Sequence, residues 1–149
     1  MVREIERRFL VHAKRLPKLV RGQPIIQGYL SVDPVVRVRL KGKLSFITIK
    51  FGETFEREEY EFRIPNKEFL SLLKKCKYKI EKIRYKVKLK EKLWEVDVFQ
   101  EKNKGLIIAE VELSSKREKI QKPLWLDREI TNEPKYLNVN LAQKPFTSW

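Results

Sequence analysis

The sequence is poor in the residues that build disulfide and zinc sites. It contains one cysteine, Cys76, and one histidine, His12, among 149 residues. A single cysteine cannot form an internal disulfide, and its place in "FLSLLKKC" predicts a half-buried helix residue rather than a nucleophile. A Cys/His zinc framework is excluded, and a Ser–His–Asp triad is not expected.

Long apolar runs are missing too. No apolar stretch approaches the roughly 18 residues of a membrane-spanning helix, and no signal peptide precedes the first predicted strand. We therefore expect a soluble cytoplasmic protein with no membrane partner. The length predicts a single domain over residues 1–149, large enough to bury about two thirds of its unfolded surface.

Charge is abundant and unbalanced. Charged residues make up 36% of the chain, against about 25% in typical globular domains. The 34 lysines and arginines exceed the 20 acidic residues by 14, and the pI is near 9.9. This excess favours a polyanionic partner, which could be nucleic acid, an anionic membrane or a polyphosphate compound. A solvated lysine-rich surface is the alternative explanation for many of these lysines.

Alternation of apolar and polar residues with period two predicts eight strands. They cover residues 3–11, 25–31, 35–41, 44–51, 56–64, 79–89, 93–100 and 106–113. Short polar links around Gly42, Gly52 and Gly105 favour antiparallel hairpins.

Three helices are expected outside the strands. The clearest runs from Asn66, as N-cap, to about Cys76. A weaker one follows Ser114 or Ser115 and ends before Pro123. The tail "YLNVNLAQKPF" predicts a last short helix that stops at Pro145.

Several strands carry charge on one face and apolar residues on the other. In "EIERRFLV", Glu4, Glu6 and Arg8 share a face, and Ile5 and Phe9 lie on the opposite one. The same alternation places further charged side chains on common faces: Arg37, Arg39 and Lys41; Arg57, Glu59 and Glu61; Lys82, Arg84 and Lys86; Glu95 and Asp97; Glu110 and Glu112.

Two architectures accommodate this pattern. An open sheet could bury its apolar face under helices and expose its charges to water. Alternatively, the fold is α+β, a closed antiparallel eight-stranded β-barrel with helices packed on the outside and the charges inside, and closure also removes the edge strands. The mixture of positive and negative side chains favours the barrel, because a sheet surface that binds nucleic acid does not need paired carboxylates. Nucleic acid is therefore not the expected partner.

A cavity lined by both signs suits a polyphosphate bridged by a divalent metal. Arginine and lysine bind phosphate oxygens, and hard cations prefer carboxylate oxygens. The clustered carboxylates Glu4, Glu6, Glu110 and Glu112 would repel one another unless a cation lay among them.

These residues resemble the triphosphate tunnel metalloenzymes, also called the CYTH superfamily. "EIERRFLV" resembles the family's opening signature of Glu-x-Glu-x-basic. The resemblance continues in order through "QGYL", "VVRVRL", "ITIK", "REEYEFRI", "EKIRYKV", "WEVDVF", "AEVEL", "WLDREIT" and "KYLNVNLA", over nearly the whole chain. It implies an antiparallel tunnel in which Mg²⁺ or Mn²⁺ and basic residues hold a triphosphate, with hydrolysis of inorganic triphosphate to diphosphate and phosphate as the usual reaction of short microbial members.

The resemblance also implies roles for individual residues. Glu4, Glu6, Glu110 and Glu112 are expected to bind metal, with Asp97 as an additional ligand or as a carboxylate just behind the ligands. Glu59 and Glu61 are expected to be wall carboxylates that orient arginines or help to bind metal. Phosphate binding is expected from Arg8, Arg37, Arg39, Lys50, Lys82 and Arg84, and from Lys135 in the tail. Tyr29 and Lys82 resemble a dyad that activates water, although Tyr29 could equally be an aromatic packed at the barrel mouth.

The sequence departs from the family at three places. Arg8 stands where a lysine is usual, Leu137 occupies an often basic place, and Asp127 replaces a common glycine. Other activities remain open, namely adenylate cyclase chemistry, hydrolysis of another nucleoside or thiamine triphosphate, and non-catalytic binding of polyphosphate or RNA. Either a monomer or a homodimer is compatible with the sequence.

Overall fold

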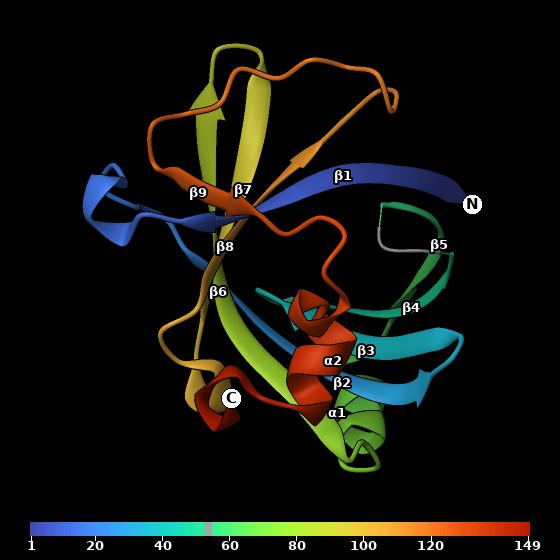
Figure 1. Cartoon of the computed structure of the whole chain (residues 1–149). Coiled ribbons are helices and arrows are strands. Elements are labelled where there is room, and N and C mark those ends of the chain that lie inside the picture. Colours follow the sequence, from blue (N-terminus) through green and yellow to red (C-terminus); the bar gives the residue numbers. More distant parts are fainter. Residues whose placement is uncertain (53–54) are drawn as a thin grey trace.

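The computed structural model describes residues 1–52 and 55–149, and its main feature is a closed antiparallel β-barrel (Figure 1). The eight strands of the ring are β1 (Val2–Val11), β2 (Gln23–Val32), β3 (Val35–Lys41), β4 (Leu44–Gly52), β5 (Glu56–Ile64), β6 (Tyr78–Leu89), β7 (Lys92–Phe99) and β8 (Ile107–Glu112). They follow the order β5-β4-β3-β2-β6-β7-β8-β1, and β1 pairs again with β5. The predicted α+β barrel is confirmed. The predicted turn after Gly52 falls partly on residues 53–54, outside the described residues.

Strand β1 closes the ring. Its first residues pair with β5, from Val2 to Ile5, and the following ones pair with β8, from Glu6 to Leu10. A short strand outside the ring, β9 (Leu126–Glu129), pairs with β1 at Phe9 and Val11, past the residues of β1 that pair with β5. The sequence did not predict β9, because four residues of "LDRE" show no alternation of apolar and polar side chains.

Helix α1 (Asn66–Leu73) packs on the outside of β2, β3 and β4, where Phe69 is buried against Val38. The helix is shorter than predicted, and Cys76 is buried beyond its end rather than half-buried within it. Asn66 is the first helical residue and not the N-cap, which is Pro65. The Asn66 side chain instead accepts a hydrogen bond from Ser45 Oγ.

The predicted helix between Ser114 and Pro123 is wrong, since this segment forms a bend, a short turn and irregular backbone. Ile120 is its one partly buried apolar residue, so a helix there would have no apolar face to bury. Within the segment, Glu118 accepts hydrogen bonds from the backbone and side chain of Ser114.

The C-terminal segment folds into the expected short helix, α2 (Asn138–Gln143), which lies across one end of the barrel (Figure 1). The turns η3 (Pro134–Tyr136) and η4 (Phe146–Ser148) flank it, and η1 (Ala13–Arg15) and η2 (Glu101–Asn103) are the other 3₁₀ turns. Leu141 packs in a buried cluster with Tyr29, Ile80 and Phe99, which closes this end of the barrel.

A further apolar cluster lies outside the barrel, over β1, β7 and β8, and centres on Phe9, Trp94 and Trp125. Connecting segments 12–22 and 114–125 cover it through Leu16, Leu19 and Ile120 among others. In the described part of the chain, no helix has the length and apolar character needed to cross a membrane.

The position of Leu141 generates a stability prediction. Leu141→Ala should lower the free energy of unfolding by about 2–5 kcal/mol, because it leaves a cavity in a fully buried cluster. Leu124→Ala is the matched control, since Leu124 is 86% exposed and should change stability by less than about 0.5 kcal/mol. Equal midpoints for the two variants in urea unfolding would mean that the tail does not pack in solution as described.

Candidate active site

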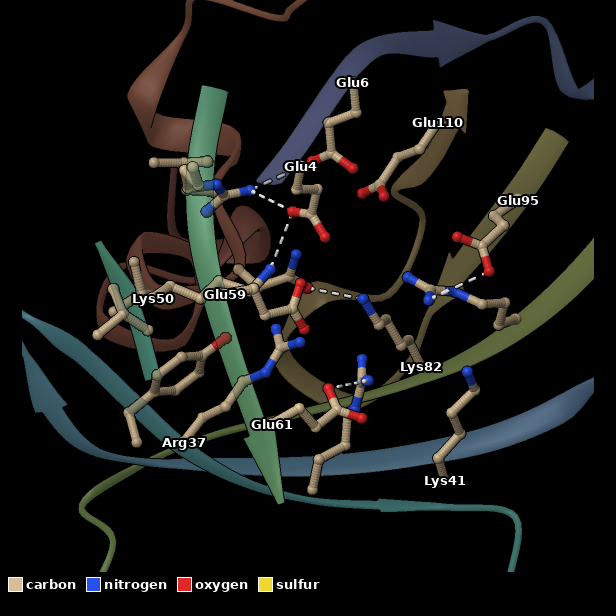
Figure 2. A pocket seen from close by; sticks show the side chains of 18 of the residues that line it. Glu4, Glu6, Arg37, Lys41, Lys50, Glu59, Glu61, Lys82, Glu95 and Glu110 are labelled. Atoms are coloured by element: carbon tan, nitrogen blue, oxygen red, sulfur yellow. Dashed lines mark hydrogen bonds and ion pairs between the residues drawn. The ribbon is translucent and has the colours of Figure 1, made fainter. Parts of the chain in front are cut away.

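A charged cavity of about 270 Å³ lies inside the barrel (Figure 2). Among the described residues, seven basic and seven acidic side chains line it. The basic ones are Arg37, Arg39, Lys41, Lys50, Arg57, Lys82 and Arg84, and the acidic ones are Glu4, Glu6, Glu59, Glu61, Glu95, Glu110 and Glu112. The rest of the lining is Tyr29, Val35, Leu137, Asn138 and Val139.

The two signs occupy opposite halves of the barrel. The carboxylates project from β1, β5, β7 and β8, which are neighbours in the ring, and the basic groups project from β3, β4 and β6. Arg57 on β5 is the exception. The cavity can therefore hold an anion against one wall and a cation against the other.

Three carboxylates, those of Glu4, Glu6 and Glu110, converge at the acidic wall (Figure 2). Burial, followed by the nearby Glu110 and Glu4 charges, raises the pKa of Glu6 to about 8. Basic side chains offset part of this repulsion: Lys50 Nζ lies 3.2 Å from Glu4 Oε1, and an Arg57 guanidinium nitrogen lies 3.2 Å from Glu6 Oε1.

These carboxylates fit a hard divalent cation by donor type and by charge. Mg²⁺ and Mn²⁺ prefer carboxylate oxygens, and a cation would relieve the repulsion that raises the pKa of Glu6. Burial and the charges of Glu4 and Glu95 also raise the pKa of Glu112. As the side chains stand, no three acidic, cysteine or histidine residues of 1–52 and 55–149 form a ready-made metal cluster, so metal binding would exchange the ion pairs with Lys50 and Arg57 for metal contacts.

Lys82 is a fully buried amine held by fixed partners. Its Nζ lies 2.8 Å from Asp97 Oδ2, donates to Asn138 Oδ1 at 3.0 Å, and lies 5.5 Å from the centre of the Phe99 ring. Burial, the largest effect, lowers the pKa of Lys82 to about 8, although the charge of Asp97 raises it. Lys82 therefore has both a neutral and a charged form near neutral pH, and its side chain lines the cavity.

Asp97 does not line the cavity. Its Oδ1 accepts from Arg84 Nε at 2.8 Å, its Oδ2 accepts from a second Arg84 nitrogen at 2.9 Å, and it is fully buried. Together with Lys82, this bidentate pair uses both carboxylate oxygens. The structure thus gives Asp97 the position of an anchor for two basic residues, behind the side chains that line the cavity.

Arg37 and Arg39 each have a hydrogen-bond donor that no described residue uses. In the described part of the chain, the Nε atom of each is buried and has no hydrogen-bond partner. Arg39 lies 3.5 Å from Glu61 Oε2, and its pKa falls to about 10 because of burial, then of Arg37 and Arg84. Both arginines line the cavity, and a planar guanidinium with several donors suits the oxygens of an anion there.

Tyr29 is buried at the closed end of the cavity, in contact with the tail cluster. Its hydroxyl oxygen accepts a hydrogen bond from Gln27 Nε2 at 2.8 Å. Burial raises the pKa of Tyr29, although the positive charge of Arg37 opposes this. Since the oxygen is an acceptor from Gln27, the hydroxyl proton can be donated to another group.

Two predicted phosphate binders lie outside the cavity lining. Arg8 is 1% exposed, and its guanidinium contacts Glu110 Oε1 at 3.1 Å and the carbonyl oxygen of Tyr136 at 2.9 Å. Lys135 lies on the outside of the tail, with Nζ 4.4 Å from the centre of the Trp149 ring. Arg8 therefore joins the acidic wall to the tail.

Among the described residues, four polar lining residues were not among the predicted site residues. Strand alternation placed Lys41, Arg57 and Glu95 on charged strand faces but predicted no role in the site for them. Asn138 gave no such signal, because its contact with Lys82 depends on how the tail packs across the barrel end.

Comparisons with known proteins agree with this geometry. The CYTH domain matches residues 2–145. The chain is 39% identical to an inorganic triphosphatase of Acetivibrio thermocellus, over 100% of this chain and 99% of the relative, and 35% identical to one of Nitrosomonas europaea, over 93% and 96%. A crystal structure of an inorganic triphosphatase superposes with a TM-score of 0.71 at 35% identity, over 95% of each chain. The chain belongs to the CYTH domain family.

Proposed function

We propose that this chain is a divalent-metal-dependent inorganic triphosphatase, which hydrolyses triphosphate to diphosphate and phosphate. The observation that carries the proposal is the cavity in which a carboxylate wall faces a basic wall. The whole-length similarity to two proteins named inorganic triphosphatase supports it.

The basic wall, formed by side chains of β3, β4 and β6, would bind the substrate. Arg37 and Arg39 offer free buried donors, and Arg84 is held in place by Asp97. The uncharged part of the lining is small, so the cavity offers few groups that could recognise a nucleobase. We therefore propose that inorganic triphosphate is preferred to ATP.

The carboxylate wall would hold the metal. Glu4, Glu6, Glu110 and Glu112 supply the oxygen donors that suit Mg²⁺ or Mn²⁺. When bound, the metal neutralises charge on the phosphate oxygens.

Lys82 would accept the proton of the attacking water. Its pKa of about 8 provides a neutral fraction near neutral pH, and Asp97 and Asn138 fix its position. Tyr29, whose oxygen accepts from Gln27, can donate a hydrogen bond to the oxygen of the water or to a phosphate oxygen while it keeps its proton. Water then attacks the terminal phosphorus and the diphosphate leaves.

The first test is a substrate panel. Purified protein with Mg²⁺ or Mn²⁺ should release phosphate from inorganic triphosphate with a kcat/KM at least ~100-fold above that for ATP, and excess EDTA should abolish release. Products resolved by ion-exchange chromatography would also reveal cyclic AMP or diphosphate. Comparable turnover of ATP, or full activity in excess chelator, would refute the proposal.

The second test concerns Lys82. If the neutral amine accepts the proton, kcat/KM, which reports the free enzyme, should rise with pH through about 8, because protonated lysine below that pH cannot act as a base. Lys82→Arg keeps the charge and removes the usable base, so kcat should fall by roughly 10²-fold or more with little change in KM. Arg39→Lys is the matched comparison and should act mainly on KM.

A near-native kcat and an unchanged pH profile in Lys82→Arg would remove Lys82 from the chemical step. Circular dichroism and thermal unfolding of both variants check that any loss of activity does not come from loss of fold.

A further inference from the structure

Two outer pockets share lining residues with the charged cavity. The first has a volume of about 310 Å³ and lies beside the β6–β7 hairpin. Among the described residues, five carboxylates and two amines line it: Glu6, Glu91, Glu95, Glu110, Glu112, Lys86 and Lys92. Lys92 already forms an ion pair with Glu118, so it offsets little of this negative charge.

The second outer pocket has a volume of about 390 Å³ and lies beside the start of β1. Its charged side chains in the described part of the chain are Glu4, Glu59, Glu61, Glu112 and Arg3. Arg3 forms ion pairs with Glu56 and Glu58. Both outer pockets are therefore acidic, although the whole chain has a net charge of +14.

Glu95 lines both the cavity and the first outer pocket. Its neighbours in register are Lys86 on β6 and Glu110 on β8. Its Oε2 atom lies 3.4 Å from an Arg84 guanidinium nitrogen, and Figure 2 shows this contact at the side of the cavity. The Glu95 side chain is 25% exposed, so it lies between the buried basic groups and the outer pocket.

The contact with Glu95 completes the set of carboxylate partners around Arg84. Asp97 accepts hydrogen bonds from Nε and from one terminal nitrogen of the guanidinium, at 2.8 and 2.9 Å. Glu95 accepts one from the other terminal nitrogen. An anion that approaches Arg84 in the cavity therefore competes with Glu95 and also meets its negative charge.

Other basic groups of the cavity have carboxylate partners too. Lys50 Nζ lies 3.2 Å from Glu4, and an Arg39 nitrogen lies 3.5 Å from Glu61. The buried Nε atoms of Arg37 and Arg39, however, have no hydrogen-bond partner among the described residues, so the cavity keeps donors for an anion. A cation that binds the carboxylates would release the basic groups, so a cation and an anion would favour each other's binding.

We propose that Glu95 is a specificity-determining residue, which disfavours the free triphosphate anion and admits triphosphate that carries a divalent cation. This rests on the proposed function, because the cavity must be the triphosphate site. Free triphosphate carries several negative charges, and the Glu95 charge repels all of them. A divalent cation on the triphosphate offsets part of that charge and gives Glu95 an opposite charge to face.

Arg84 does not depend on Glu95 for its position. Asp97 is fully buried and holds Arg84 through two short hydrogen bonds, whereas the Glu95 contact is longer, at 3.4 Å. Loss of the Glu95 charge should therefore leave Arg84 in place and make it more available to an anion. If Glu95 only supported Arg84, the same change would weaken anion binding.

Calorimetric binding of a non-hydrolysable triphosphate analogue tests the proposal, once in excess EDTA and once with Mg²⁺. Glu95→Gln keeps the size of the side chain and removes its charge. Glu91→Gln is the matched control, because Glu91 lines the same outer pocket but is exposed and does not line the cavity. Thermal unfolding checks that both variants are folded.

In EDTA, we expect Glu95→Gln to bind the analogue at least ~10-fold more tightly than the wild type, and Glu91→Gln to change by less than about threefold. With Mg²⁺, the gain of Glu95→Gln should shrink to less than about threefold. An unchanged or weaker affinity of Glu95→Gln in EDTA would overturn the proposal, as would equal gains in the two variants or an equal gain with Mg²⁺. The expected binding without phosphate release from triphosphate would refute the triphosphatase proposal and still support the role of Glu95.

Discussion

Charge neutralisation inside the barrel is the constraint on which the rest of the structure depends. Buried charges are costly unless they are paired and hydrogen-bonded. Among the described residues, fourteen charged side chains line one cavity, and seven of them are buried. Asp97 pairs with both Lys82 and Arg84, Lys50 with Glu4, and Arg8 with Glu110. The raised pKa of Glu6 shows where pairing is incomplete, and that is the wall suited to a metal ion.

A barrel with a charged interior must find its hydrophobic stabilisation elsewhere. The apolar faces of the strands point outwards, so they need covers: α1 over β2, β3 and β4, and the segments around Trp125 over β1, β7 and β8. The tail supplies a third apolar cluster at the closed end of the barrel through Leu141. The same segments serve the site, because Asn138 of the tail holds Lys82 and Tyr136 binds Arg8.

Strand periodicity predicts much of this arrangement. Alternation placed Glu4 with Glu6 and Glu110 with Glu112, and all four line the cavity. Alternation determines on which face of its strand a side chain lies. It does not determine how far along the barrel axis the side chain sits, or which residue of the next strand it faces. Asp97 is therefore on the predicted face yet buried against Arg84, its neighbour in register on β6.

In the tail, by contrast, the local sequence gives little information about where the side chains lie. Lys135 and Asn138 are three residues apart, but Asn138 reaches Lys82 while Lys135 lies over Trp149 on the outside. The packing of Leu141 and Ala142 against the barrel end sets this orientation, and it is a long-range effect. The helix wrongly predicted after Ser114 failed for a related reason, because Ile120 is the only large apolar side chain that the segment could pack.

The central claim is that the two walls bind one metal–triphosphate complex. Its most direct test is whether binding of the triphosphate strengthens binding of the metal. The affinity for Mn²⁺, measured by electron paramagnetic resonance, should increase at least ~10-fold when a non-hydrolysable triphosphate analogue is present, beyond the binding of Mn²⁺ by the free analogue. Glu4→Gln with Glu6→Gln should abolish this increase while the protein stays folded. Equal Mn²⁺ affinity with and without the analogue, or unchanged coupling in the double variant, would contradict the account.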